Sequence, residues 1–232
     1  MKKIAILLFA LTLGTNVLVA QNNCSKYYPM KEGTTFEYTQ FDKKGKNNGT
    51  SNFTITTVKN DDGETVATMH MTYSDKKGKN AYESNYNITC TGDGIKIDFA
   101  SLMPTKMIEQ YKDMDVKMDI NGTDIELPNN LSVGQQLADA NVSLKMDMGV
   151  MKMNIKVDMI NRKVEKREQV TTAAGTFDCY LITETSKSET MGMAQEMNSK
   201  LWLAEGIGMI KQEMYKKNGD LLSRSELSKF SN

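Results

Sequence analysis

Apolar and polar residues alternate with a period of two through most of the chain after about residue 35. The alternating segments are rich in Thr, Val, Ile and Tyr, and Gly, Asn and Asp separate them. Strands place successive side chains on opposite faces of a sheet, so this pattern predicts strands and turns. We expect strands at residues 36–41, 53–58, 67–73, 82–90, 95–99, 116–120, 124–127, 144–148, 151–159, 177–185, 194–203, 208–215 and 221–230.

One segment follows a helical pattern instead. Met103, Met107, Ile108 and Tyr111 fall on one helical face, and Pro104 lies in the first turn, where its missing N–H costs no hydrogen bond. The sequence therefore predicts one short helix over residues 103–112.

Two positions indicate how neighbouring strands connect. Asn121-Gly122 is a strong signal for a two-residue hairpin turn, so we expect residues 116–120 and 124–127 to pair with each other. At Gly149 the apolar positions change parity, which predicts a tight turn or a bulge between two strands.

The first 20 residues have the organisation of a cleavable signal peptide. Lys2 and Lys3 precede an apolar core at residues 4–13, and Val17-Leu18-Val19-Ala20 suits cleavage before Gln21. The apolar core is too short to span a bilayer, and no later window is apolar enough to anchor the mature chain. We therefore expect an exported protein, periplasmic or secreted, with no transmembrane segment after processing.

The first cysteine does not fit a lipid-modification site. Cys24 follows Gln21-Asn22-Asn23, where lipidation would need small and aliphatic residues. The mature protein is therefore expected to begin at Gln21 and not to be a lipoprotein. Residues 21–232 are interpreted as a single β-rich domain.

Weak internal similarity suggests that this domain is a degenerate duplication. Asp93-Gly94-Ile95-Lys96 is similar to Gly208-Met209-Ile210-Lys211, and Gly33 and Gly134 precede the two sets of strands. The two halves would cover about residues 27–100 and 131–230.

The charge balance argues against a class of partner, and the cysteine content predicts a disulfide. The chain has 29 basic and 29 acidic residues, and this balance argues against a nucleic-acid partner. The 3 cysteines are Cys24, Cys90 and Cys179, and export to an oxidising compartment favours one disulfide. Cys90 is the expected member of that disulfide, with Cys24 preferred and Cys179 as the alternative partner.

Three segments resemble the TapB-like family of exported proteins, which have a related domain of unknown function. The segments are Cys24–Gly33, Thr172–Tyr180 and Trp202–Lys211, and together they span nearly the whole mature chain. The resemblance implies a strongly curved antiparallel sheet or open half-barrel, similar in outline to periplasmic lipoprotein carriers. It implies no established activity.

Methionine is the most unusual part of the composition, with 18 residues. Met151 and Met153 alternate in register with Ile155 and Val157, which indicates packing on the apolar face of a strand. Thioethers also bind Cu(I), so periplasmic copper handling is the alternative function. A Met-rich face lining an open cavity for an apolar ligand is a third interpretation, with Met151, Met153 and Trp202 as ligand-facing residues.

No arrangement of residues suggests catalysis. His70 is the only histidine and lies in phase with polar residues, so triads and multi-histidine zinc sites have no candidate. We expect no enzyme, no catalytic residue, no bound metal and no cofactor. The leading hypothesis is an exported binding or assembly protein whose curved sheet holds an apolar or lipidic ligand, or a segment of an envelope protein.

Overall fold

The computed structural model describes residues 24–61, 63–102, 117–147 and 152–232. These residues form one antiparallel sheet of 13 strands, in the order β6-β8-β9-β10-β11-β12-β13-β1-β2-β3-β4-β5-β7. The strands are β1 (Thr35–Asp42), β2 (Asn47–Asp61), β3 (Glu64–Asp75), β4 (Asn80–Cys90), β5 (Gly94–Ile97), β6 (Lys117–Gly122), β7 (Ile125–Pro128), β8 (Ala140–Asp147), β9 (Lys152–Thr172), β10 (Gly175–Thr190), β11 (Met193–Ala204), β12 (Gly208–Lys216) and β13 (Leu221–Ser231). A short 3₁₀ turn, η1 (Ala100–Leu102), follows β5.

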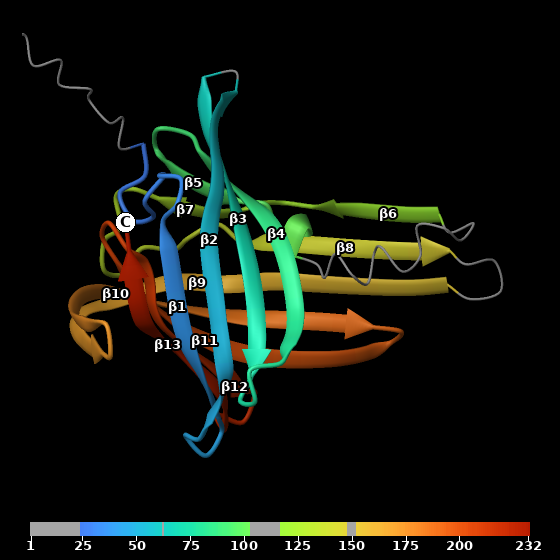
Figure 1. Cartoon of the computed structure of the whole chain (residues 1–232). Helices are drawn as coiled ribbons and strands as arrows, with labels where there is room; N and C mark the ends of the chain where they lie inside the picture. Colours follow the sequence, from blue (N-terminus) through green and yellow to red (C-terminus); the bar gives the residue numbers. More distant parts are fainter. Residues whose placement is uncertain (1–23, 62, 103–116, 148–151) are drawn as a thin grey trace, which may run out of the picture.

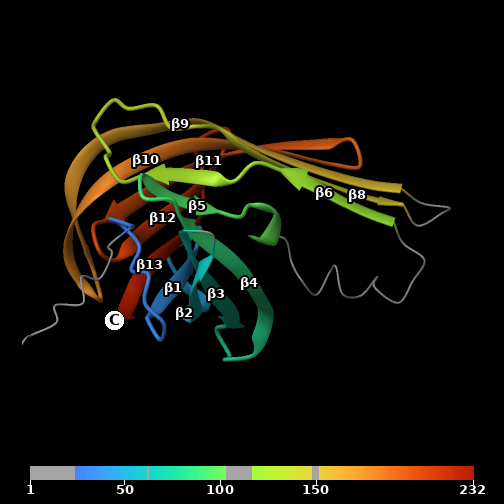
Figure 2. The same ribbon diagram turned by 90° about the horizontal axis from the view of Figure 1, so that it is seen from above.

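The sheet is strongly curved and open. In Figure 1, β1–β4 run steeply across β8 and β9, which lie behind them. Figure 2 shows β9–β11 arching over β1–β4 when the molecule is seen from above. β6 and β7 are the two edges of the sheet and do not pair with each other. The prediction of a mainly β protein built on a strongly curved antiparallel sheet is therefore confirmed.

Some sequence predictions lie outside the described residues. These are the signal peptide at residues 1–20, the helix at residues 103–112 and the turn at Gly149. β8 and β9, which flank residues 148–151, pair antiparallel, with Asp147 opposite Lys152. The described residues contain no helix whose length and hydropathy would let it cross a membrane.

The core lies on the concave side, where the two halves of the sheet face each other. β-branched and long aliphatic side chains suit this position because each covers much of a pleated surface. The first half contributes Ile55, Met69 and Ile88, and the second contributes Val164, Ile182, Leu203 and Ile210, all in one cluster with at most 2% exposure. Burial of this face explains the alternation that the sequence shows.

The two halves repeat a specific backbone arrangement. Gly33 donates its N–H to the carbonyl of Ile55 at 2.8 Å, and Gly134 donates to Val164 at 2.7 Å. Both glycines have positive φ, 83° and 89°, which side-chain-bearing residues rarely adopt. Strand pairing is irregular directly after Ile55 in β2 and directly after Val164 in β9.

The strand order repeats as well. β8–β13 are consecutive neighbours, and β1–β5 followed by β7 form the matching series, joined to the first through the β13–β1 pair. This arrangement makes β2 the geometric counterpart of β9 and β3 the counterpart of β10. A duplication covering about residues 27–100 and 131–230 stays a prediction.

The hairpin predicted at Asn121-Gly122 is wrong. β6 pairs with β8, and β7 pairs with β5, so the two strands lie at opposite edges of the sheet. The predicted turn needs positive φ at both central residues, and neither Asn121 nor Gly122 has it. The missing side chain of Gly122 instead lets β6 approach the Asn141 carbonyl of β8, a space that a Cβ atom would fill.

Candidate ligand-binding cavity

A cavity of about 280 Å³ lies between the two halves of the sheet. One wall is aromatic and comes from β1, β2 and β4: it contains Phe36, Tyr38, Phe53 and Tyr86. The other half contributes Met159, Leu201 and Met209 together with the polar side chains of Arg162, Glu184 and Gln212. The cavity is therefore mainly apolar with a small polar group, as in most small-molecule sites.

Tyr28 from the N-terminal segment completes the aromatic wall. Its ring lies against Gly208, so close that a Cβ on this glycine would lie 2.5 Å from the ring. Burial raises the pKa of Tyr28 to about 12. Tyr38 is buried beside it and donates its hydroxyl to the Met209 carbonyl at 2.9 Å. Burial likewise raises the pKa of Tyr38 and of Tyr86.

The N-terminal segment, residues 24–33, is attached to both halves of the sheet. Cys24 forms a disulfide with Cys90 at the end of β4, as the sequence predicts. On the other half, Gly206 donates its N–H to the Lys26 carbonyl at 2.9 Å, and the Lys26 ammonium lies 3.0 Å from Glu205. These contacts bring the segments Cys24–Gly33 and Trp202–Lys211 together.

Asn129 ties the same segment to the loops beside it. Its side chain accepts the N–H of Lys26 at 2.7 Å and donates to the Cys24 carbonyl at 2.9 Å. Cys179, the alternative disulfide partner, is a buried free thiol instead. Burial raises the pKa of its thiol to about 11, which makes it a poor nucleophile.

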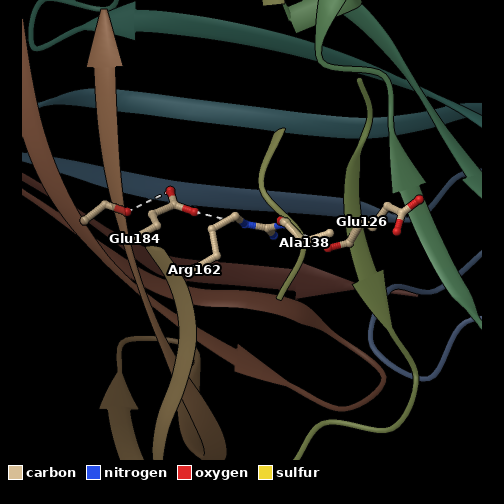
Figure 3. Close-up of polar contacts among 5 residues, drawn as sticks. Glu126, Ala138, Arg162 and Glu184 are labelled. Carbon is tan, nitrogen blue, oxygen red and sulfur yellow. Dashed lines mark hydrogen bonds and ion pairs between the residues drawn. The ribbon is translucent and has the colours of Figure 1, made fainter. Parts of the chain in front are cut away.

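A buried ion pair forms the polar end of the cavity (Figure 3). Arg162 is 4% exposed, and its Nε lies 3.6 Å from a carboxylate oxygen of Glu184. The other carboxylate oxygen of Glu184 accepts a hydrogen bond from Ser199 at 2.8 Å. Nη1 of Arg162 donates to the backbone carbonyls of Ala138 at 2.6 Å and Glu126 at 3.2 Å. Burial is the main cause that lowers the pKa of Arg162, and the nearby carboxylates oppose it.

A bulge turns Arg162 towards the cavity. In a regular strand Met159 and Arg162 would point to opposite faces, because side chains alternate. Asn161 between them has φ of 55°, and the β9–β10 register shifts at this point, so both residues line the cavity. Bulges often redirect a side chain next to functional sites.

The sequence does not single out Arg162 or Glu184. The alternation that ends at Met159 gives no sign that an arginine three positions later is buried. The only signal in the sequence is that the apolar alternation ends at Met159 and that Val164 has the opposite parity, which Arg162 shares.

Trp202 lies on the opposite face of the sheet from Leu201, its neighbour in β11 that lines the cavity. Its indole N–H donates to Glu168 at 2.9 Å, and the Lys211 ammonium lies 4.6 Å from the ring centre. Trp202 is 7% exposed. Trp202 belongs to the buried core cluster, and its ligand-facing role stays a prediction.

The methionines occupy separate places. Met153 is opposite Met146 in the β8–β9 ladder and lines a surface depression beside it, away from the central cavity. Met151 lies outside the described residues. Met193 and Met191 are exposed at the tip of the β10–β11 hairpin. Within the described ranges, no group of three or more His, Cys, Asp or Glu side chains is placed to hold a metal ion.

The sequence model of the DUF3108-like family matches residues 31–227. The chain belongs to the DUF3108-like family. The matched region runs from the end of the N-terminal segment into β13 and includes Arg162 and Glu184. Among curated proteins, no significant match was found.

Two solved structures are similar to this DUF3108-like chain. A Bacteroides fragilis protein, described as exported and as having a YmcC-like fold, superposes with a TM-score of 0.70 at 18% identity, covering 90% of this chain and 100% of its own. A Parabacteroides distasonis protein, described as a lipoprotein, gives 0.69 at 20% identity, covering 89% and 99%. At these identities the similarity establishes a shared fold.

Proposed function

We propose that this protein is an exported, non-enzymatic binding protein that holds one small apolar ligand between the two halves of its curved sheet. The central cavity is the observation that carries the proposal. Its volume of about 280 Å³ is near the lower end of the range for small-molecule sites, roughly 300–1,000 Å³. Aromatic side chains such as Phe53 and Tyr86 offer large apolar contact areas to a ligand.

The location of the cavity supports this role. Because its walls come from two halves of one sheet and from the N-terminal segment, a ligand would contact elements far apart in the chain. A TapB-like relationship and a periplasmic or secreted location belong to the same proposal. The similar structures support it to the extent that one is described as an exported protein and the other as a lipoprotein.

Fluorescence of N-phenyl-1-naphthylamine, an uncharged apolar probe, tests the proposal on the protein purified from its native host. We expect saturable binding to the oxidised, ligand-extracted protein. Leu201→Trp should fill the cavity and weaken binding by at least about tenfold, because the new side chain occupies the same space. Native mass spectrometry before extraction should show a retained small apolar molecule.

Val133→Trp is the matched control, because Val133 is 59% exposed and does not line the cavity. This variant should bind the probe as the parent does. Absence of probe binding, or equal binding by folded Leu201→Trp, would exclude the cavity as a ligand site.

A further inference from the structure

Arg162 retains hydrogen-bonding capacity in the cavity. Nη1 donates to two backbone carbonyls, and the buried Nε faces the Glu184 carboxylate at 3.6 Å. Among the described residues, no hydrogen bond from Nη2 is found. Nη2 is therefore the donor that remains for a ligand, and a donor left without an acceptor in a poorly hydrated site costs about 1–3 kcal/mol.

The charge of Arg162 is already compensated. Glu184 faces it at 3.6 Å, and the negative charges of Asp139 and Glu126 also act on it. An anionic ligand would add a further negative charge to a poorly hydrated site that contains these carboxylates. Burying such a charge without a free cation is strongly unfavourable. The site therefore offers a hydrogen-bond donor but no unbalanced positive charge.

The first half of the sheet shows that the fold does not need an ion pair here. Arg162 lies two residues before Val164 in β9, and Phe53 lies two residues before Ile55 in β2. Phe53 is opposite Met71 of β3 and also lines the cavity. The equivalent position thus accommodates an apolar pair. Buried ion pairs often contribute no more stability than apolar residues of similar size, so the pair in the second half requires another explanation.

We infer that the cavity takes an uncharged amphiphile: one short hydrocarbon chain or ring that carries a hydroxyl, ester or amide oxygen. The oxygen accepts a hydrogen bond from Arg162, and the apolar part lies against the aromatic wall of the first half. The cavity volume of about 280 Å³ favours a ligand with one short chain over a lipid with two long chains. This inference rests on the proposed function and adds the chemistry of the ligand's polar group.

Competition with three ligands of equal chain length tests the inference. 1-Decanol, decanoate and decylammonium are each titrated against bound N-phenyl-1-naphthylamine at about pH 8, where the acid is ionised and the amine is protonated. Equal chains keep the apolar contribution the same, so differences report on the polar group. We expect 1-decanol to displace the probe at a concentration at least about tenfold lower than either ion. Decanoate or decylammonium matching or exceeding 1-decanol would overturn the inference.

Glu184→Gln changes the charge while keeping an oxygen that can accept from Ser199. With one carboxylate removed, Arg162 becomes available to an anion. We expect decanoate to gain at least about tenfold in affinity and 1-decanol to change little. Glu196→Gln, on the outer surface beside Lys217, is the control and should leave the order of competitors unchanged.

Different results would contradict the proposed binding function and the inferred uncharged headgroup. A parent protein that does not bind the probe contradicts the proposed function. A parent that binds the probe in the cavity but prefers decanoate contradicts only the uncharged headgroup. If Glu184→Gln does not fold, the order of competitors on the parent protein still decides the question.

Discussion

The ring of Tyr28 lies against the backbone of Gly208, in space that a Cβ atom at this position would occupy. Gly208 also has φ of 97°, which disfavours any other residue. Gly208→Ala should lower the free energy of unfolding by about 2–5 kcal/mol, combining backbone strain with displacement of the ring. It should also weaken probe binding, because Tyr28 forms one wall of the cavity.

Gly219→Ala is the matched control for this prediction. Gly219 has φ of 89°, and a Cβ atom at this position would have no neighbouring atom within 4 Å. This variant should lose only about 1–2 kcal/mol from backbone strain and bind the probe normally. Equal losses in the two variants, measured by chemical denaturation, would show that the contact with Tyr28 contributes nothing.

Asn161 sets the direction of Arg162, so its backbone conformation should control binding. Asn161→Val should cost about 1–2 kcal/mol, because a β-branched residue tolerates φ of 55° poorly. Asn161→Gly should be tolerated, since glycine adopts positive φ readily. We expect only the valine variant to lose affinity for 1-decanol in the competition assay. Equal affinity in both variants would argue that the bulge does not orient the arginine.

Thiol counting tests the disulfide between Cys24 and Cys90. Without reductant, the native protein should expose no reactive thiol, and the denatured protein should expose only Cys179. Replacing both Cys24 and Cys90 by Ala should lower stability by about 2–4 kcal/mol, because the unfolded chain is no longer constrained. Three reactive thiols in the unreduced, denatured protein would contradict the disulfide.

Buried tyrosines should make the fold sensitive to alkali. The pKa of Tyr28 is raised from 10.0 to about 12, so the folded state favours the protonated phenol. Its contribution to stability is fully present below about pH 10 and is lost as pH rises towards 12. Tyr28→Phe should reduce the slope of unfolding free energy against pH over this interval. An unchanged slope would mean that the phenol ionises equally in both states.

Replacing Met146 and Met153 by Leu distinguishes a packing role for these residues from Cu(I) binding. If these residues fill apolar space across the β8–β9 ladder, replacing both by Leu should cost less than about 1.5 kcal/mol per site. A Cu(I) competition titration on the same proteins checks the alternative. Tight copper binding by the parent that disappears in a folded double variant would favour the copper-handling hypothesis.

Alternation along the chain predicts most of the sheet because burial on one face produces it directly. Ile55, Ala67 and Met69 follow this rule and lie in the core. The prediction fails where a local signal competes with long-range pairing: Asn121-Gly122 suits a tight turn, but β6 and β7 pair with other strands.

The candidate site is harder to predict for a related reason. Arg162 enters the core only because Asn161 adopts a left-handed conformation, and nothing in the local pattern requires this. β9 also continues to Thr172, well past the predicted end at residue 159, because the bulge interrupts the alternation that would identify a strand. The disulfide between Cys24 and Cys90 is easier to predict, since few cysteines allow few pairings.

The pairing of β1 with β13 has a consequence for how the chain folds. Thr35 at the start of β1 is opposite Ser231 at the end of β13, 196 positions later in the chain. The edge of β1 therefore stays unpaired until β13 is available, and closing this seam is a very long-range event. Truncation before β13 should leave both halves without their shared neighbour, so a chain without β13 is expected to aggregate and a chain with β13 to fold slowly.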